Sequence, residues 1–414
     1  MSNPPTILVN PSYDPTSLRG QGDDSPTSSS SAYTFHRTVL PGYAPTALLP
    51  LQTPPSASKR FRGRVYLKAE NDRYALPAFK VLGAAWASFL SLCDELHLDA
   101  QSTTLDALRT ATSEKRAGAG AGELEMVAAT DGNHGCAVAW FASLVGIRAH
   151  IFTPGNVSPP SRARIRSMGA QVCVTHLADL DYDAAVQRAA AYAADATSTT
   201  TTRLLIQDTA WEGYTTTPQR IVDGYTTIFT ELDQQLHAAA AAAAAVEAAE
   251  GRNGGAPSHV IVPVGVGSLA QAVVQHYHQR RPRPDDAVAT RVVSVEPTTA
   301  ACLSHSLLLG RNEAIETGET IMPGLNCGTV SDLAWPSLRT GIAAAVQVDD
   351  AAVETAMRHL EAIDGVVAGP CGAAPFAALS TLLENEDEAQ RLGLLDRDDV
   401  SVVLLMTEGK MECE

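Results

Sequence analysis

Two segments of the chain carry a polar side chain that could take part in covalent or acid–base chemistry. Lys80 lies among apolar neighbours in the run Ala78–Gly83, and a lysine in an apolar pocket loses proton affinity, so that its free amine can form a Schiff base. The run Ala129–Gly135 offers Asp131 as a base or an ammonium partner and Asn133 as a hydrogen-bond donor. Taken alone, Lys80 fits a surface lysine better than a catalytic one, and Asp131 or Asn133 fits a simple helix N-cap.

Two further segments are glycine-rich turns that lead into predicted helices. The backbone amides of one turn would form an anion site at a helix N-terminus; its residues are Gly265, Val266, Gly267, Ser268 and Leu269. It departs from the dinucleotide-binding pattern, because position 270 is Ala. The other turn places Cys371 among small residues, where an inert buried cysteine is the simplest interpretation. No C-x-x-C pair points to a metal site.

All four segments follow predicted strands in an alternating pattern of strands and helices. Such alternation, with helices of about 10–15 residues, predicts parallel βαβ units and an α/β fold. Ligands bind such sheets at the carboxyl ends of the strands, where these segments lie. The strands are expected at 65–68, 126–129, 148–152, 171–174, 204–207, 259–264, 292–295 and 402–406, and the main helices at 78–97, 134–145, 181–195, 268–279 and 350–364.

Composition narrows the class of protein. A chain of 414 residues predicts two or three domains, and its net charge of −16 argues against nucleic acid as a partner. No secretory signal and no apolar run of membrane-spanning length is visible, and the seven cysteines are odd in number and scattered. We therefore expect a cytoplasmic protein that does not bind membranes. Residues 1–33, rich in Ser, Pro and Thr, are expected to form a disordered leader.

Taken together and in this order, the segments resemble fold-type II pyridoxal-phosphate enzymes, and within that group the diaminopropionate ammonia-lyases. The resemblance covers roughly residues 35–410, and its most specific piece is the run Gln207–Tyr214 (QDTAWEGY), which generic serine or threonine dehydratases lack. The other pieces that carry it are Phe35-His36, Pro41–Thr46, Lys68–Asn71, Phe79–Gly83, Ala129–Gly135 and Thr407–Gly409.

This resemblance implies pyridoxal phosphate as the cofactor. A thiol beside the pyridine nitrogen does not force protonation of that nitrogen, which favours elimination. By resemblance, Lys80 is the Schiff-base lysine, Phe79 lies beside the cofactor ring, and Asn133 forms a hydrogen bond with the phenolic oxygen. The resemblance also implies that residues 265–269 bind the phosphate. Cys371 and, as a weaker candidate, Thr407 are expected near the pyridine nitrogen.

Two carboxylates complete the implied site. The position of Asp131 is usually Ser in hydroxy-amino-acid dehydratases, and an Asp suits a substrate with an extra ammonium group. Asp131 and Asp208 would each remove the α-proton of one substrate enantiomer, with the freed Lys80 as an alternative base. The implied reaction is α,β-elimination on 2,3-diaminopropionate, a small amino acid, to give pyruvate and two ammonia.

The resemblance also implies a homodimer of chains with two open parallel-sheet domains and the cofactor in the cleft between them. We expect a large domain over 34–92 and 212–414 and a small domain over 93–211. The run Ala368–Ala373 is closer to serine dehydratases than to the family pattern. A serine/threonine dehydratase-like or β-replacement enzyme of the same fold is therefore the alternative, and a non-catalytic ligand-binding pseudoenzyme the remote one. A protein without colour and without cofactor would favour the pseudoenzyme.

Overall fold

The computed structural model describes residues 6–19, 29–117, 122–130, 132–155, 157–174, 182–195, 197, 200–247, 256–279 and 289–409. The chain divides into two compact units. Unit 1 takes the described residues within 6–19, 45–72 and 228–409, and unit 2 takes those within 29–44 and 73–227. Within these ranges no helix is long and apolar enough to cross a membrane.

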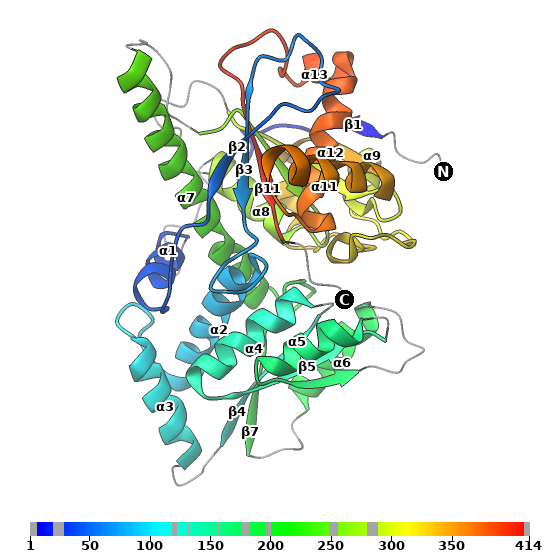
Figure 1. Cartoon of the computed structure of the whole chain (residues 1–414). Coiled ribbons are helices and arrows are strands. Elements are labelled where there is room, and N and C mark those ends of the chain that lie inside the picture. Colours follow the sequence, from blue (N-terminus) through cyan, green and yellow to red (C-terminus); the bar gives the residue numbers. More distant parts are fainter. Residues whose placement is uncertain are drawn as a thin grey trace. The chain divides into compact units, whose positions relative to one another are not determined.

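Unit 1 is built on a seven-stranded sheet (Figure 1). Its five central strands run parallel, and one antiparallel strand pairs at each edge. The central strands are rich in Val, Ile and Leu and buried on both faces, as parallel sheets require. In sheet order the strands are β1 (Ile7–Val9), β10 (Ile342–Val348), β9 (Arg291–Pro297), β8 (His259–Pro263), β11 (Ser401–Met406), β3 (Arg64–Ala69) and β2 (Leu48–Leu51).

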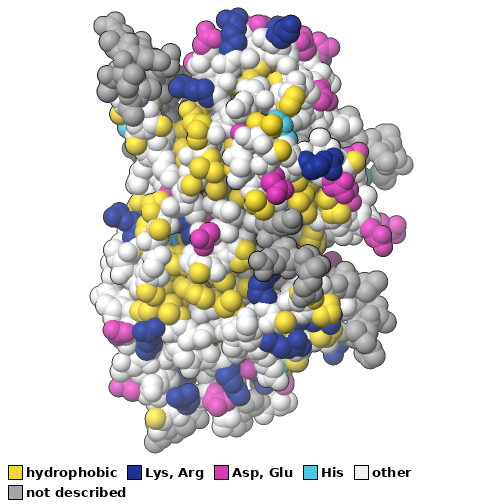
Figure 2. All heavy atoms as spheres, viewed as in Figure 1, with side chains coloured by type: hydrophobic (Ala, Val, Ile, Leu, Met, Phe, Trp, Pro, Cys, Tyr) yellow, Lys and Arg dark blue, Asp and Glu magenta, His cyan; other side chains and the backbone are white. Residues whose placement is uncertain are grey.

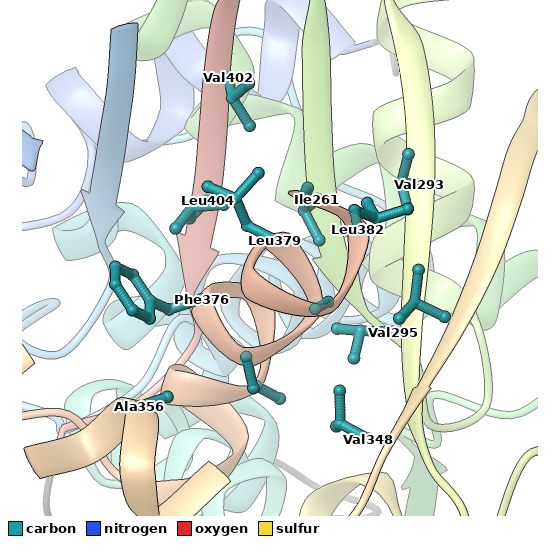
Figure 3. Close-up of a cluster of buried hydrophobic side chains, with 14 of the residues drawn as sticks. Ile261, Val293, Val295, Val348, Ala356, Phe376, Leu379, Leu382, Val402 and Leu404 are labelled. Carbon is teal, nitrogen blue, oxygen red and sulfur yellow. The ribbon is translucent and has the colours of Figure 1, made fainter. Parts of the chain in front are cut away.

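The core of unit 1 lies between this sheet and helix α12 (Pro370–Glu384). Figure 3 shows Phe376, Leu379 and Leu382 of α12 directed at side chains of the central strands. All three side chains are almost fully buried, so this interface contributes much of the stability of unit 1. The other helices of the unit are α8 (Ser268–Val274), the π-helix η1 (Gln275–Gln279), α9 (Cys302–Leu309), the 3₁₀ turn η2 (Pro323–Leu325), α10 (Trp335–Gly341), α11 (Asp350–Asp364) and α13 (Glu386–Arg391).

Unit 2 carries a four-stranded parallel sheet. The strand order is β6 (Gln171–Val174), β5 (Arg148–Thr153), β4 (Glu123–Ala129) and β7 (Thr201–Leu205). Because the chain moves outward from β4 to β6 and then returns to β7, right-handed crossovers place α6 on the face opposite α4 and α5. The helices are α1 (Ser29–Thr38), α2 (Lys80–Leu96), α3 (Leu105–Ala117), α4 (Asn133–Val145), α5 (Pro159–Ser167), α6 (Tyr182–Ala194) and the first part of α7 (Thr216–Glu247).

Helix α2 is the central helix of unit 2. It is apolar around most of its circumference, and its residues from Val81 to Leu90 are buried without a break. A helix of this composition has to be covered on all sides; α1, α3 and α4 pack against it. Lys80 begins this helix, so its backbone is held by one of the most buried elements of the unit.

The predicted parallel α/β architecture is confirmed, with two differences at the edges of the expected domains. The sequence predicts a disordered leader over 1–33. Among its described residues this is wrong at two places, because Ile7–Val9 pairs with β10 and helix α1 begins at Ser29; residues 1–5 and 20–28 lie outside the described residues. The apolar run at Ile7–Val9 supplies a strand that closes the edge of the sheet. The unit division also differs from the expected boundaries, since residues 34–44, 73–92 and 212–227 fall in unit 2.

The face in view in Figure 2 carries acidic and basic side chains that are intermixed. Among the described residues of that face, neither sign of charge gathers into one broad patch.

We predict that Leu379→Ala destabilises unit 1 by about 2–5 kcal/mol, because truncation removes apolar contacts and leaves a cavity against the sheet. Leu308→Ala is the matched control, since Leu308 is 40% exposed, and it should cost well under about 1 kcal/mol. Urea denaturation of both variants measures the difference. Equal losses would show that the interface between α12 and the sheet is not the core of this unit.

Candidate active site

The centre of the site in unit 2 is an ion pair between Lys80 and Asp208. Lys80 Nζ donates to Asp208 Oδ2 over 2.6 Å, and the two side chains are 25% and 5% exposed. The ring of Phe79 lies 5.5 Å from the ammonium. Burial alone would raise the pKa of Asp208. The charge of Lys80, the hydrogen bond that Lys80 donates and smaller effects of neighbouring groups together outweigh burial and hold the pKa well below the usual range. Asp208 is therefore a carboxylate over the whole physiological pH range.

The second oxygen of Asp208 is held by two neighbouring side chains. Gln207 Nε2 donates to Asp208 Oδ1 over 3.2 Å and to the hydroxyl of Tyr182 over 2.8 Å. That hydroxyl donates to the same Oδ1 over 3.4 Å. Gln207 is itself fixed, since its Oε1 accepts from the backbone of Ala129 at the end of β4. The carboxylate thus has a set orientation as well as a set charge.

The run Gln207–Tyr214 folds back on itself to hold this arrangement. Trp211 and Tyr214 exchange backbone hydrogen bonds and stack with ring centroids 4.4 Å apart. Gly213 has φ +83°, a conformation that favours glycine. The hydroxyl of Tyr214 donates to Leu205 O and accepts from Gln207 N, which ties the turn to the end of β7.

The loop between β4 and α4 is shaped by Thr130, whose buried hydroxyl accepts from the backbone of Gly132 and of Gly135. Asn133 opens α4, and its Oδ1 accepts from Arg164 Nη2 over 3.3 Å. Its side chain is partly exposed. Asp131 lies outside the described residues.

His134 follows Asn133 and is buried next to the site. Its Nε2 donates to Ile206 O over 2.7 Å. Burial lowers the pKa of this imidazole, although the charge of Asp208 acts in the opposite direction. His134 is therefore a neutral side chain that connects the start of α4 to the backbone of Ile206.

In unit 1 the predicted anion-binding turn connects β8 to α8. Gly267 has φ +94°, and a Cβ there would lie 2.9 Å from Leu338 Cδ1. A Cβ on Gly265 would lie 2.8 Å from Gly324 O. Both glycines are therefore required by close packing, and the amides that begin at Ser268 open a helix without a side-chain cap among the described residues.

Cys371 lies near this turn, and Thr407 belongs to the same unit. A Cβ on Gly324 would be 3.4 Å from Cys371 Sγ, so Gly324 borders both the turn and the thiol. Burial and then the charge of Glu408 raise the pKa of Cys371, which stays a thiol. Thr407 is 6% exposed, and its Oγ1 has no hydrogen-bond partner among the described residues.

A buried carboxylate anchors the helix next to the turn. Glu296, at the end of β9, accepts from the backbone of Leu303 and of Ser304 over 2.7 and 2.8 Å and so caps α9 from outside the helix. Burial raises the pKa of Glu296 to about 7. The thiol of Cys302 in the same helix points at Gly265 O, 3.9 Å away.

The structure brings the predicted site residues together in two groups. Lys80, Phe79 and Asp208 meet in unit 2, where Asn133 begins α4. In unit 1, Gly265 and Cys371 both border Gly324, and Thr407 follows β11. These residues fit pyridoxal phosphate. They offer the amine of Lys80, the amide of Asn133, a helix start whose glycines leave no room for a Cβ, and the buried Thr407 hydroxyl, which has no partner in the part of the chain that the structure describes. Among the described residues no cluster of His, Cys, Asp and Glu could hold a metal.

Comparison with known proteins gives the class. A family model described as pyridoxal-phosphate dependent enzyme matches residues 39–406. The chain therefore belongs to the pyridoxal-phosphate-dependent enzymes, with the parallel-sheet fold of fold type II and pyridoxal phosphate as its cofactor.

Within this class the chain is similar to diaminopropionate ammonia-lyases. It is 33% identical to the enzyme of Salmonella typhimurium strain LT2, over 91% of this chain and 87% of that one. It is 30% identical to the enzyme of Escherichia coli K12, over 94% and 91% of the two chains. A solved structure of the Escherichia coli enzyme in complex with D-serine has a TM-score of 0.77 at 26% identity, covering 98% of this chain and 94% of that one.

Sequence reasoning missed the residues that orient Asp208. Gln207 lies in the QDTAWEGY run, but nothing in that run shows that its amide bonds the next residue. Tyr182 is 26 positions away in sequence and has no local signal. Its position on α6, which runs from one parallel strand to the next, is the only indication available before the fold is known.

We predict that the free energy of unfolding of unit 1 falls as pH rises from about 4.5 to 7, in part because of Glu296. Its pKa is higher in the folded state, so folding favours the protonated form, and the stabilisation present below about pH 4.5 is lost as pH rises through 7. Glu296→Gln cannot ionise and should remove on the order of 3 kcal/mol of this pH dependence.

Denaturation midpoints of wild type and of Glu296→Gln, measured at intervals from pH 4.5 to 8, test this. Glu361→Gln on the exposed surface of α11 is the control. A Glu296→Gln variant that retains the pH slope of wild type would contradict the assignment of this pH dependence to Glu296.

Proposed function

We propose that this enzyme is an ammonia-lyase that eliminates the β-amino group of 2,3-diaminopropionate. The observation that carries the proposal is the 2.6 Å pair of Lys80 with an oriented, ionised Asp208. The chain that carries this pair is at least 30% identical to two diaminopropionate ammonia-lyases over most of its length. The products are pyruvate and two ammonia.

Each cofactor-binding residue has a proposed task that suits its chemistry. When bound, pyridoxal phosphate supplies an aldehyde for a lysine amine and a ring that accepts the electrons of a broken α C–H bond. Lys80 would hold the aldehyde carbon, Phe79 would border the ring, and Asn133 would donate to the phenolic oxygen. The amides of residues 265–269 would hold the phosphate, and Cys371 and Thr407 would be the side chains for the pyridine nitrogen.

Asp208 is proposed as the base for one substrate enantiomer. A base has to be unprotonated, and the low pKa of Asp208 secures that. Gln207 and Tyr182 fix its Oδ1 and leave Oδ2, the oxygen that Lys80 contacts, as the one that can take a proton. When the Lys80 amine moves away from Asp208 Oδ2, this oxygen is free to take the α-proton.

Asp131 is proposed as the base for the other enantiomer and as a partner for the extra ammonium group of the substrate. Its sequence position, two residues after Ala129 at the end of β4 and two before Asn133, supports this assignment. The serine/threonine dehydratase-like alternative would use the same lysine, but its substrate lacks the second ammonium group that two carboxylates suit.

We further propose a homodimer in the cytoplasm. Support for the dimer is the family resemblance. The six described cysteines are all free, which suits a reducing compartment.

We predict that Asp208→Asn and Asp131→Asn have opposite effects on the two enantiomers of 2,3-diaminopropionate. Each variant should lose about 10²–10⁴-fold in kcat for the enantiomer whose α-proton its carboxylate removes, and much less for the other, because general-base catalysis contributes that factor. Pyruvate release from the L- and D-substrates measures both constants.

Asp106→Asn is the control for loss of a carboxylate, since the Asp106 side chain is 90% exposed on α3. It should leave both activities unchanged. Equal losses for both enantiomers in each variant would refute the assignment of two bases while leaving the reaction class intact.

A further inference from the structure

Tyr225 is a buried side chain of unit 2 to which the reaction so far gives no role. It lies in the first part of α7, is fully buried, and packs against Phe79 with ring centroids 4.8 Å apart. Its hydroxyl has no hydrogen-bond partner among the described residues. A buried hydroxyl without a partner is costly, so one that persists requires an explanation.

Two glycines bring Tyr225 to the start of α2. A Cβ on Gly83 would lie 2.5 Å from Tyr225 Cε1, and a Cβ on Gly224 would lie 2.5 Å from Leu82 O. The backbones of α2 and α7 therefore approach more closely than any other residue at these two positions allows. Gly83 is one helical turn beyond Lys80, so this contact fixes Tyr225 relative to the lysine.

A buried histidine locks the same crossing. His36 is fully buried, and its Nε2 donates to Leu82 O over 3.0 Å, while its Nδ1 accepts from the hydroxyl of Thr227 over 2.8 Å. The imidazole thus joins α2 to α7 two residues beyond Tyr225. The position of the tyrosine is set by three elements, α1, α2 and α7, and not by its own rotamer alone.

The phenol lies among the charged groups of the site. It interacts electrostatically with Lys80 and with Asp208, and His134 interacts with the same two groups. Burial raises the pKa of Tyr225 far above the usual range, and the charge of Lys80 only partly offsets this. The hydroxyl is therefore neutral and can accept a hydrogen bond from an ammonium or donate one to an amine.

We propose that Tyr225 is a positioning residue for Lys80. Its hydroxyl accepts a hydrogen bond from the Lys80 ammonium and is the second partner of this group, beside Asp208. This inference rests on the proposed function, in which the lysine has to be released from its covalent bond and Asp208 has to be free to take a proton. Tyr225 receives the released amine and keeps it from returning to Asp208 Oδ2. A hydrogen bond from a charged donor is stronger than one from a neutral donor, so the hydroxyl favours the protonated lysine.

The test is the pH profile of cofactor capture by the full-length protein. Protein freed of cofactor is mixed with pyridoxal phosphate from pH 6 to 10, reduced with borohydride after set times, and digested, and the labelled Lys80 peptide is quantified by mass spectrometry. Only the unprotonated amine reacts, so the rate rises through a midpoint. Tyr225→Phe should move this midpoint at least about one pH unit lower, the shift expected for the loss of one charge-assisted hydrogen bond.

Tyr192→Phe is the matched control, because the hydroxyl of Tyr192 donates to Glu125 in the same unit, and it should keep the wild-type midpoint. Tyr225→Met removes the same hydroxyl and replaces Tyr225→Phe if that variant does not fold. An unchanged midpoint with a lower plateau rate would show that Tyr225 is only a packing residue and would overturn the inference. Absence of label on Lys80 in wild type would instead refute the proposed function.

Discussion

The site depends on keeping a lysine and a carboxylate charged together in a largely dry part of unit 2. Removing Asp208 from water costs free energy that only well-placed partners can offset. Lys80 supplies the opposite charge, and Gln207 and Tyr182 supply hydrogen bonds to the remaining oxygen. With one partner removed, the other charge would be left buried and uncompensated, which explains why so many elements of the unit converge on this pair.

The fold meets this requirement by placing each partner at the end of a different element. Lys80 begins the long, buried helix α2 of unit 2, Asp208 follows β7, and Gln207 is tied to the end of β4. The carboxyl ends of parallel strands share one edge of the sheet, so residues distant in sequence meet there. Unit 1 applies the same rule, since its glycine turn follows β8 and Thr407 follows β11.

The sequence predicts the elements and the chemically active residues well, because both leave local signals. Alternating strands and helices give the parallel sheets, and Lys80 and Asp208 stand within family motifs. Tyr225 leaves no comparable signal. Its role follows from a helix crossing that needs glycine at positions 83 and 224, and only the folded chain shows that these two glycines meet. The strand at Ile7–Val9 was missed because its pairing partner, β10, lies more than 300 residues away.

The central claim is that this site eliminates the β-amino group of 2,3-diaminopropionate, and the most direct test is the stoichiometry of the wild-type reaction. Ammonia and pyruvate are measured together with 2,3-diaminopropionate, serine and threonine as separate substrates. The account predicts turnover of 2,3-diaminopropionate with two ammonia released for each pyruvate. A holoenzyme that is inert on 2,3-diaminopropionate but releases one ammonia per keto acid from serine or threonine would contradict it.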